Sequence, residues 1–294
     1  MTKFVADSSC DIKHFNGVDF ISVPLTISTN ERTFIDDEIL DLHDMLDYME
    51  GYNGRSFTAC PGTQLWLNAF EGGDKIYVVC LTSNLSGSYN SARIAADMYL
   101  EDNEGAKIHV FDTLTTGAEM RLFVEKLIEL DGAGLEFEEV VAKAEEYLKT
   151  TRIFFAFQSL HNLAQNGRIS KVVAAAVGAL NINIVGTGTF DGKLDPLAKR
   201  RGEKHAASEI LHQLEECGFN GGKVRISHTD NKLLAQKYAA NIKKLYPEAD
   251  IKIYESGGLI GYYAERGGII VAVETDRVQF ADVEIPEESD SAAE

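Results

Sequence analysis

The sequence predicts an α/β protein of two domains, in which a parallel, doubly wound N-terminal sheet is followed by a mixed-sheet C-terminal domain. The chain has 294 residues, a length typical of two domains. In the first half, short runs rich in Val, Ile and Phe alternate with amphipathic helical patterns, which is typical of a parallel sheet. In the second half, Asp191-Gly192 separates two strand-like runs, which predicts a β-hairpin.

The first half contains four strand-like runs and three helical patterns. The predicted strands span residues 3–6, 75–81, 107–111 and 153–157. The predicted helices span residues 88–100, 116–130 and 136–149. Helices that follow parallel strands in this way cover the faces of a buried sheet.

The second half predicts a sheet of mixed direction with its own helices. Its predicted strands span residues 182–190, 193–197, 223–227, 251–254 and 269–273, and its helices residues 203–217 and 232–246. We therefore predict an N-terminal domain over residues 1–160 and a C-terminal domain over 161–284. The acidic, apolar-poor tail at 285–294 is predicted to be flexible.

The composition excludes several classes of function. The formal net charge of −18 disfavours sequence-independent binding to nucleic acid or anionic membranes, which requires clustered Lys and Arg. No run approaches the roughly 20 apolar residues of a membrane span, and the first residues do not resemble a signal peptide. Four scattered cysteines favour free thiols in a reducing compartment. We therefore expect a cytoplasmic protein without stable membrane insertion.

Hydroxyl-rich loops follow three of the predicted strands, at residues 7–9, 82–88 and 112–117. The carboxyl ends of parallel strands share one edge of a sheet, where ligands bind. The helices that follow present free backbone N–H groups there, which suits an anion. The alternative is that Ser and Thr only cap these helices. Residues 36–38, Asp-Asp-Glu, similarly indicate the acidic first turn of a helix.

An ordered set of short motifs gives the strongest functional signal. The segment TSNLSGSYNSA, residues 82–92, resembles the S-S-x-L-S-G-T-Y-x-x-A signature of the DegV family of bacterial fatty-acid-binding proteins. Further segments resemble the family's motifs in the family's order, over roughly residues 3–280: ADSSCD (6–11), VPL (23–25), TACP (58–61), NGRIS (166–170) and RG (201–202).

The resemblance implies a two-domain α/β fold in which a fatty acid lies in a tunnel, with the acyl chain buried and the carboxylate near the domain junction. It implies the lipid-binding subunit of a fatty acid kinase, which is not a complete enzyme because a separate ATP-binding subunit phosphorylates the carboxylate. By position, Ser86 and Thr58 match residues that hydrogen-bond the carboxylate. The other residues matched to the site are Gly87, Arg168, Arg201 and Tyr263.

The chain departs from the family pattern in the late I-G-x-H-x-G-P-G segment, which here reads IGYYAERG (residues 260–267). Tyr263 stands in place of the histidine, and Glu265 and Arg266 replace Gly and Pro. In the earlier T-S-Q-P motif, Ala59 replaces the serine. A tyrosine hydroxyl can donate one hydrogen bond, but it does not titrate near neutral pH as histidine does.

The run VVAAAVGAL, residues 172–180, has small side chains and is helix-like. Small side chains could leave space for an acyl chain along the wall of the tunnel. The alternative is that they allow close helix packing.

Other motifs predict neither a cofactor nor a metal. Residues 186–193 lack the spacing of a phosphate-binding loop and favour the hairpin, and the seven histidines show no metal-ligand spacing. Cys60 has no evident histidine partner. One enzymatic alternative remains: the fold resembles the substrate-binding part of dihydroxyacetone kinases, in which a histidine forms a covalent adduct with a ketone. His228 is the candidate for that role.

Overall fold

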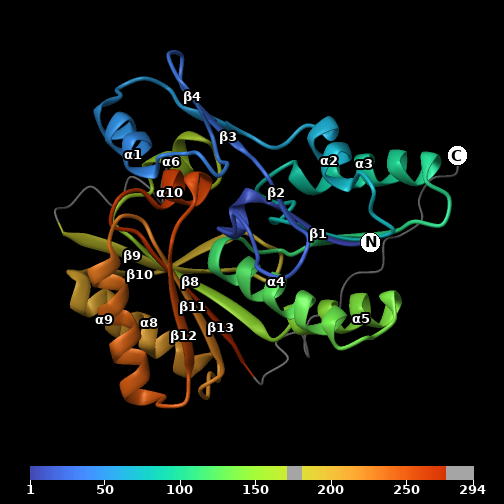
Figure 1. Cartoon of the computed structure of the whole chain (residues 1–294). Coiled ribbons are helices and arrows are strands. Elements are labelled where there is room, and N and C mark those ends of the chain that lie inside the picture. The colour runs from blue at the N-terminus through green and yellow to red at the C-terminus, as the bar shows by residue number, and fades with distance from the viewer. Residues whose placement is uncertain (171–180, 276–294) are drawn as a thin grey trace, which may run out of the picture.

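The computed structural model describes residues 1–170 and 181–275, and it contains two main sheets on either side of helix α4 (Gly117–Gly132) (Figure 1). The run at 172–180 and the tail at 285–294 lie outside the described residues. Both predicted sheet types are present, so the predicted fold class is confirmed.

The N-terminal sheet has four strands in the order β2-β1-β6-β7, and every neighbouring pair is parallel. Its strands are β1 (Thr2–Asp7), β2 (Phe20–Val23), β6 (Lys75–Cys80) and β7 (Lys107–Asp112). Helices α2 (Thr63–Phe70) and α3 (Ser88–Asp102) pack on one face, and α4 and α5 (Phe137–Leu148) on the other. Alternate side chains of each strand point to opposite faces, so every position after the first is buried in the two central strands, β1 and β6.

The C-terminal sheet has six strands in the order β10-β9-β8-β13-β11-β12. Its strands are β8 (Thr151–Phe157), β9 (Ile182–Gly188), β10 (Leu194–Arg201), β11 (Lys223–His228), β12 (Asp250–Glu255) and β13 (Ile269–Glu274). Only β11 and β12 are parallel; the other described pairs are antiparallel. The sheet is therefore mixed, and β9 and β10 form the predicted hairpin.

Helices cover both faces of the six-stranded sheet. Helices α8 (Glu203–Glu216) and α9 (Lys232–Leu245) pack on one face. The other face packs against α4, α6 (His161–Gln165) and α10 (Gly258–Ala264). Strand β8 pairs with β9 and β13, so the chain enters the six-stranded sheet before residue 160. The domain boundary at residue 160 stays a prediction.

Helix α4 joins the two sheets because it is apolar on two sides. Met120 and Phe123 pack against the four-stranded sheet, while Ala118 and Leu122 pack against the six-stranded sheet. All four side chains are at most 2% exposed. Burying each large side chain contributes about 1.5–3 kcal/mol, so the two sheets share one continuous apolar interior through this helix.

A third, small sheet was not predicted. It has the order β4-β3-β5 and consists of β3 (Thr26–Ser28), β4 (Thr33–Ile35) and β5 (Phe57–Ala59). Helix α1 (Leu42–Gly51) packs on it, and the buried Tyr262 of α10 completes this cluster. Strands of three residues are too short to show a periodic pattern, which is why the sequence did not reveal them.

Asp36 caps a helix distant in sequence rather than the one that follows it. Helix α1 begins only at Leu42, after the N-cap residue Asp41. Asp36 is fully buried and accepts hydrogen bonds from the backbone N–H groups of Gly258 (2.6 Å) and Leu259 (3.0 Å), at the start of α10. The acidic segment therefore complements a helix N-terminus, as its composition indicates, but its partner helix is more than 200 residues away.

A second buried carboxylate holds the same helix. Asp11 accepts a backbone hydrogen bond from Gly257 (2.7 Å) and one from the hydroxyl of Ser227 (2.7 Å). Burial raises its pKa from 3.8 to about 6, although both hydrogen bonds oppose this shift. Asp11 lies after β1, so the N-terminal segment is anchored directly to the C-terminal part of the chain.

Two further findings concern the cysteines and the helices of the chain. Its four cysteines are free thiols. Among residues 1–170 and 181–275, no helix combines the length and the apolar character that crossing a bilayer requires.

Replacing Asp11 with asparagine should change how stability depends on pH. Because the pKa of Asp11 is higher in the folded state, the folded state binds a proton at this carboxyl group more tightly than the unfolded state does. This tighter binding stabilises the fold fully below about pH 3.8, and the stabilisation is lost as the pH rises through about 6. Asparagine does not ionise and tolerates the left-handed backbone at this position (φ 56°). Asp11→Asn should therefore be more stable than wild type at pH 7.5, by up to about 3 kcal/mol, and equal to it near pH 4.

Urea denaturation at pH 4, 5.5 and 7.5 measures this difference. Glu38→Gln, which removes an exposed carboxylate from a nearby segment, is the matched control and should show no such trend. An Asp11→Asn variant whose stability relative to wild type is the same at all three pH values would contradict the assignment.

Candidate ligand-binding site

A cavity of about 290 Å³ lies where the two main sheets, α10 and the β9–β10 hairpin meet. One side is formed by loops at the carboxyl ends of β6 and β7, and the opposite side by β8, β13 and α10. Cavities at the carboxyl edge of a parallel sheet are common ligand sites. This one also has walls from both halves of the chain.

The hydroxyl-rich loops meet at this edge, as predicted. Asp7 accepts hydrogen bonds from the backbone N–H of Leu81 (2.9 Å) and the hydroxyl of Ser88 (2.6 Å). The backbone N–H of Thr82 donates to the carbonyl of Thr115 (2.9 Å). The loops after β1, β6 and β7 are therefore fixed to one another, and the second and third line the cavity.

The tip of the β9–β10 hairpin closes one side of the cavity. The hydroxyl of Thr82 donates to the carbonyl of Gly192 (2.9 Å). Gly192 has φ 75°, and a Cβ atom there would lie 2.1 Å from the hydroxyl oxygen of Thr82, so only glycine fits. This contact brings Lys193 to the cavity wall. The position of Lys193 at the cavity was not predicted, because nothing in a hairpin sequence shows which edge its tip will contact.

Four of the predicted site residues lie near one another on the cavity wall, in a region that we call the mouth: Thr58, Ser86, Arg168 and Tyr263. Their side chains are only partly buried. The hydroxyls of Thr58, on β5, and Tyr263, on α10, are hydrogen-bonded at 2.7 Å although 205 positions separate them. The mouth thus carries three hydroxyl groups and one guanidinium.

Ser86 and Gly87 lie in the loop that leads into α3. The Ser86 hydroxyl accepts a hydrogen bond from the backbone N–H of Ser88 (3.3 Å), which leaves its own proton available to donate. Gly87 is the N-cap residue of α3 and makes no side-chain cap bond. A Cβ atom at Gly87 would lie 3.3 Å from the sulfur of Cys60 across the mouth. This loop therefore offers hydrogen-bond donors to an anion, although Ser86 and Gly87 carry no charge.

Arg168 supplies the positive charge of the predicted set. Its Nε–H donates to the carbonyl of Leu85 (3.0 Å), and a terminal N–H donates to the carbonyl of Asn166. These bonds fix the guanidinium beside the 82–88 loop. Arginine has five N–H donors, so two bonds to carbonyls leave others for a ligand.

Tyr263 remains a neutral hydroxyl at physiological pH. Burial raises the pKa of its phenol above the ordinary value of 10, and this effect outweighs the opposing hydrogen bond with Thr58 and the charge of Arg168. A protonated phenol can donate to a carboxylate. Tyr263 therefore places a hydroxyl group at the family's histidine position, without that residue's titration near neutral pH.

The interior of the cavity is apolar and buried. Its walls include Phe155, Phe157, Ile260 and Ile270, each at most 5% exposed. Thr116 also lines the cavity, and within the described ranges its buried hydroxyl oxygen has no hydrogen-bond partner. An apolar interior behind a polar mouth suits a ligand with a polar head and a hydrocarbon tail.

Two residues named from the sequence lie away from the cavity lining. Arg201 is exposed on β10, and its carbonyl contacts the ring of His205 (2.9 Å). His228 is 5% exposed at the end of β11, and its ring nitrogen accepts the backbone N–H of Asn231 (3.4 Å). Neither residue is among the described residues that line the cavity, so five of the six predicted head-group positions lie on its wall.

Comparison with known proteins identifies the family. Residues 1–276 match the sequence model described as "Uncharacterised protein, DegV family". A DegV domain-containing protein of Streptococcus pneumoniae is 40% identical over 278 residues, which is 93% of this chain and 99% of that protein.

Solved structures show the same relationship. A DegV family protein from Eubacterium eligens, loaded with heptadecanoic acid, is 47% identical with a TM-score of 0.92, over 94% of this chain and 100% of that one. The Fatty Acid Kinase (Fak) B3 protein of Streptococcus pneumoniae, loaded with linoleic acid, is 40% identical with a TM-score of 0.91, over 94% and 99% of the two chains. This chain belongs to the DegV family.

Proposed function

We propose that this protein binds a long-chain fatty acid and presents its carboxyl group, in the cytoplasm, to a separate ATP-dependent kinase subunit that forms an acyl phosphate. The acyl chain occupies the apolar interior, and the carboxylate lies at the mouth. The residues that hold the carboxylate in this proposal are Ser86, Gly87, Thr58, Tyr263 and Arg168.

The observation that carries the proposal is the division of the cavity into a buried apolar interior and a partly exposed polar mouth. The relatives loaded with heptadecanoic and linoleic acid support it, because they share the fold over almost the whole chain. A fatty acid has the matching division into a hydrocarbon tail and an anionic head.

The tail must provide most of the affinity. Burial of each methylene contributes about 0.8 kcal/mol, so some fifteen of them contribute roughly 12 kcal/mol. Loss of translational and rotational freedom removes at least about 4 kcal/mol of this. The remainder is sufficient for stable binding provided that the head group does not oppose it.

The mouth has to offset the cost of removing a carboxylate from water. Hydrogen bonds to a charged group contribute about 1.5–3 kcal/mol each. The hydroxyl of Ser86 can donate one, the hydrogen-bonded pair of Thr58 and Tyr263 can donate a second, and Arg168 adds a positive charge. These donors hold the head group near the surface, where a second protein can reach it.

The partner kinase supplies ATP in this proposal. One carboxylate oxygen attacks the γ-phosphorus of ATP, an O–P bond forms, and the bond to the leaving ADP breaks. The part that this chain plays is to position the carboxylate, since placing two reactants in the correct geometry lowers the barrier substantially. The Streptococcus pneumoniae relative named as a fatty acid kinase B3 protein supports the partnership.

Native mass spectrometry of the protein purified from bacteria tests the binding directly. We expect a complex whose added mass equals one long-chain fatty acid, identified after extraction. Recovery of ligand-free protein that also fails to bind oleate after delipidation would contradict the proposal.

Ser86→Ala should weaken fatty acid binding by about 10- to 100-fold, because it removes one hydrogen bond to a charged group. Titration of delipidated protein with a fluorescent fatty acid measures the change. Ser83→Ala is the matched control, since Ser83 lies on the same loop but is exposed and does not line the cavity. Wild-type affinity in a folded Ser86→Ala variant would remove Ser86 from the site.

Reconstitution with a purified bacterial fatty acid kinase ATP-binding subunit tests the presentation step. Together with ATP and oleate, the two proteins should form acyl phosphate, trapped as the hydroxamate with hydroxylamine. This chain with ATP and oleate alone should form none. Acyl phosphate formed by this chain without the second subunit would contradict the proposed division of roles.

A further inference from the structure

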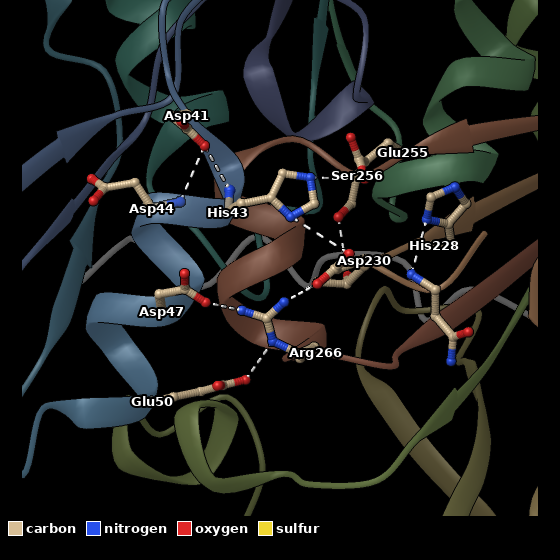
Figure 2. Close-up of polar contacts among 12 residues, drawn as sticks. Asp41, His43, Asp44, Asp47, Glu50, His228, Asp230, Glu255, Ser256 and Arg266 are labelled. Atoms are coloured by element: carbon tan, nitrogen blue, oxygen red, sulfur yellow. Dashed lines mark hydrogen bonds and ion pairs between the residues drawn. The ribbon is translucent and has the colours of Figure 1, made fainter. Parts of the chain in front are cut away.

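We propose that His43, Asp230 and Glu255 form a binding site for a divalent transition-metal ion, with Zn²⁺ the ion that best suits it. One ring nitrogen and one oxygen from each carboxylate lie within 4.8 Å of one another. Nδ1 of His43 lies 3.5 Å from a carboxylate oxygen of Asp230, and Nε2 lies 3.7 Å from one of Glu255. Figure 2 shows the imidazole between the two carboxylates.

The three side chains come from three separate parts of the fold. His43 is in the first turn of α1, where its backbone N–H donates to the carboxylate of Asp41 (3.0 Å) (Figure 2). Asp230 follows β11, and Glu255 is the last residue of β12. The site therefore joins the N-terminal part of the chain to the six-stranded sheet.

The carboxyl ends of β11 and β12 bring Asp230 and Glu255 together. These strands are the parallel pair of the sheet, with His228 opposite Glu255 in the register. The backbone N–H of Ser256 donates to the carbonyl of His228 (2.9 Å), which ties the two strand ends. Side chains beyond the carboxyl ends of adjacent parallel strands are well placed to converge on a ligand.

Arg266 orients Asp230 from the side away from the imidazole. Its guanidinium donates to one oxygen of Asp230, and the other oxygen faces His43 (Figure 2). The same guanidinium also binds Asp47 and Glu50 of α1, the latter at 2.7 Å. Hydrogen bonds that fix the outer atom of a ligating side chain are a regular feature of metal sites.

One imidazole nitrogen and two carboxylate oxygens are a donor set that Zn²⁺ accepts. With metal–ligand distances of 2.0–2.2 Å, tetrahedral ligands lie about 3.4 Å apart. The 3.5 Å between Nδ1 of His43 and the oxygen of Asp230 is close to this value, whereas the 3.7 Å contact of Glu255 is with the other ring nitrogen, Nε2. One ion can use only one of the ring nitrogens, so the side chain of Glu255, 46% exposed, must rotate toward the nitrogen that faces Asp230. Solvent then completes the coordination.

The site is separate from the cavity, since none of the three ligands is among the described cavity-lining residues. Metal bound there should stabilise the fold, because it joins two parts of the chain that are apart in the unfolded state. It should leave fatty acid binding unchanged.

Isothermal titration of EDTA-treated protein with Zn²⁺ tests the site, with the melting temperature as a second measurement. We expect one ion per chain and a higher melting temperature. His43→Ala and Glu255→Gln should each lower the affinity for Zn²⁺ at least tenfold and remove the rise in melting temperature. His212→Ala, which removes an exposed histidine from α8, is the matched control and should behave as wild type.

Three results would overturn the proposal: no binding to wild type at 1 mM Zn²⁺, equal affinity in His43→Ala, or a thiolate-to-cobalt charge-transfer band when Co²⁺ replaces Zn²⁺, which would assign the ion to a cysteine. Binding of oleate to His43→Ala at wild-type affinity distinguishes failure of this site from failure of the proposed lipid function.

Discussion

The attachment of helix α10 to the N-terminal half of the chain determines the geometry of the cavity mouth. Asp36 and Asp11 bind the first backbone N–H groups of this helix. Tyr263 on the helix then meets Thr58 on the small sheet. If the N-terminus of α10 were displaced, the two hydroxyls would separate, and the apolar residues of α10 would leave the cavity wall. The geometry of the mouth thus depends on two carboxylates that are not among the cavity-lining residues.

These carboxylates are costly to bury, and the helix offsets the cost. An ionised carboxylate in an apolar interior is unfavourable unless hydrogen bonds satisfy it, and the raised pKa of Asp11 shows that its hydrogen bonds do not compensate fully. For Asp36, two backbone N–H groups and Lys13, 3.6 Å away, provide the compensation. Breaking such a buried arrangement is expensive, so the helix has a single well-defined position.

The sequence predicted the fold where patterns are long and periodic. The strands β1, β6 and β7 and the helices α3 and α4 agree with their predicted ranges to within two residues, because a buried strand or an amphipathic helix leaves a repeated signal. The small sheet left none, since its strands have three residues. At the site, motif resemblance located Thr58, Ser86 and Tyr263, but not their contacts: no local rule relates residues 205 positions apart. The partner of Asp36 and the convergence of His43 with Asp230 and Glu255 were hidden for the same reason.

The chemistry of the mouth also limits what this chain can contribute to the proposed phosphoryl transfer. Its hydroxyl donors are neutral, and the raised pKa of Tyr263 keeps the phenol protonated across the physiological range. Of the predicted head-group residues that line the cavity, Arg168 is the one cation, and it is already bound to two carbonyls. Phosphoryl transfer requires several positive charges around the migrating group, usually Mg²⁺ with Lys or Arg. In this proposal those charges come from the kinase subunit, so the lipid-binding chain orients the nucleophile and the partner stabilises the transition state.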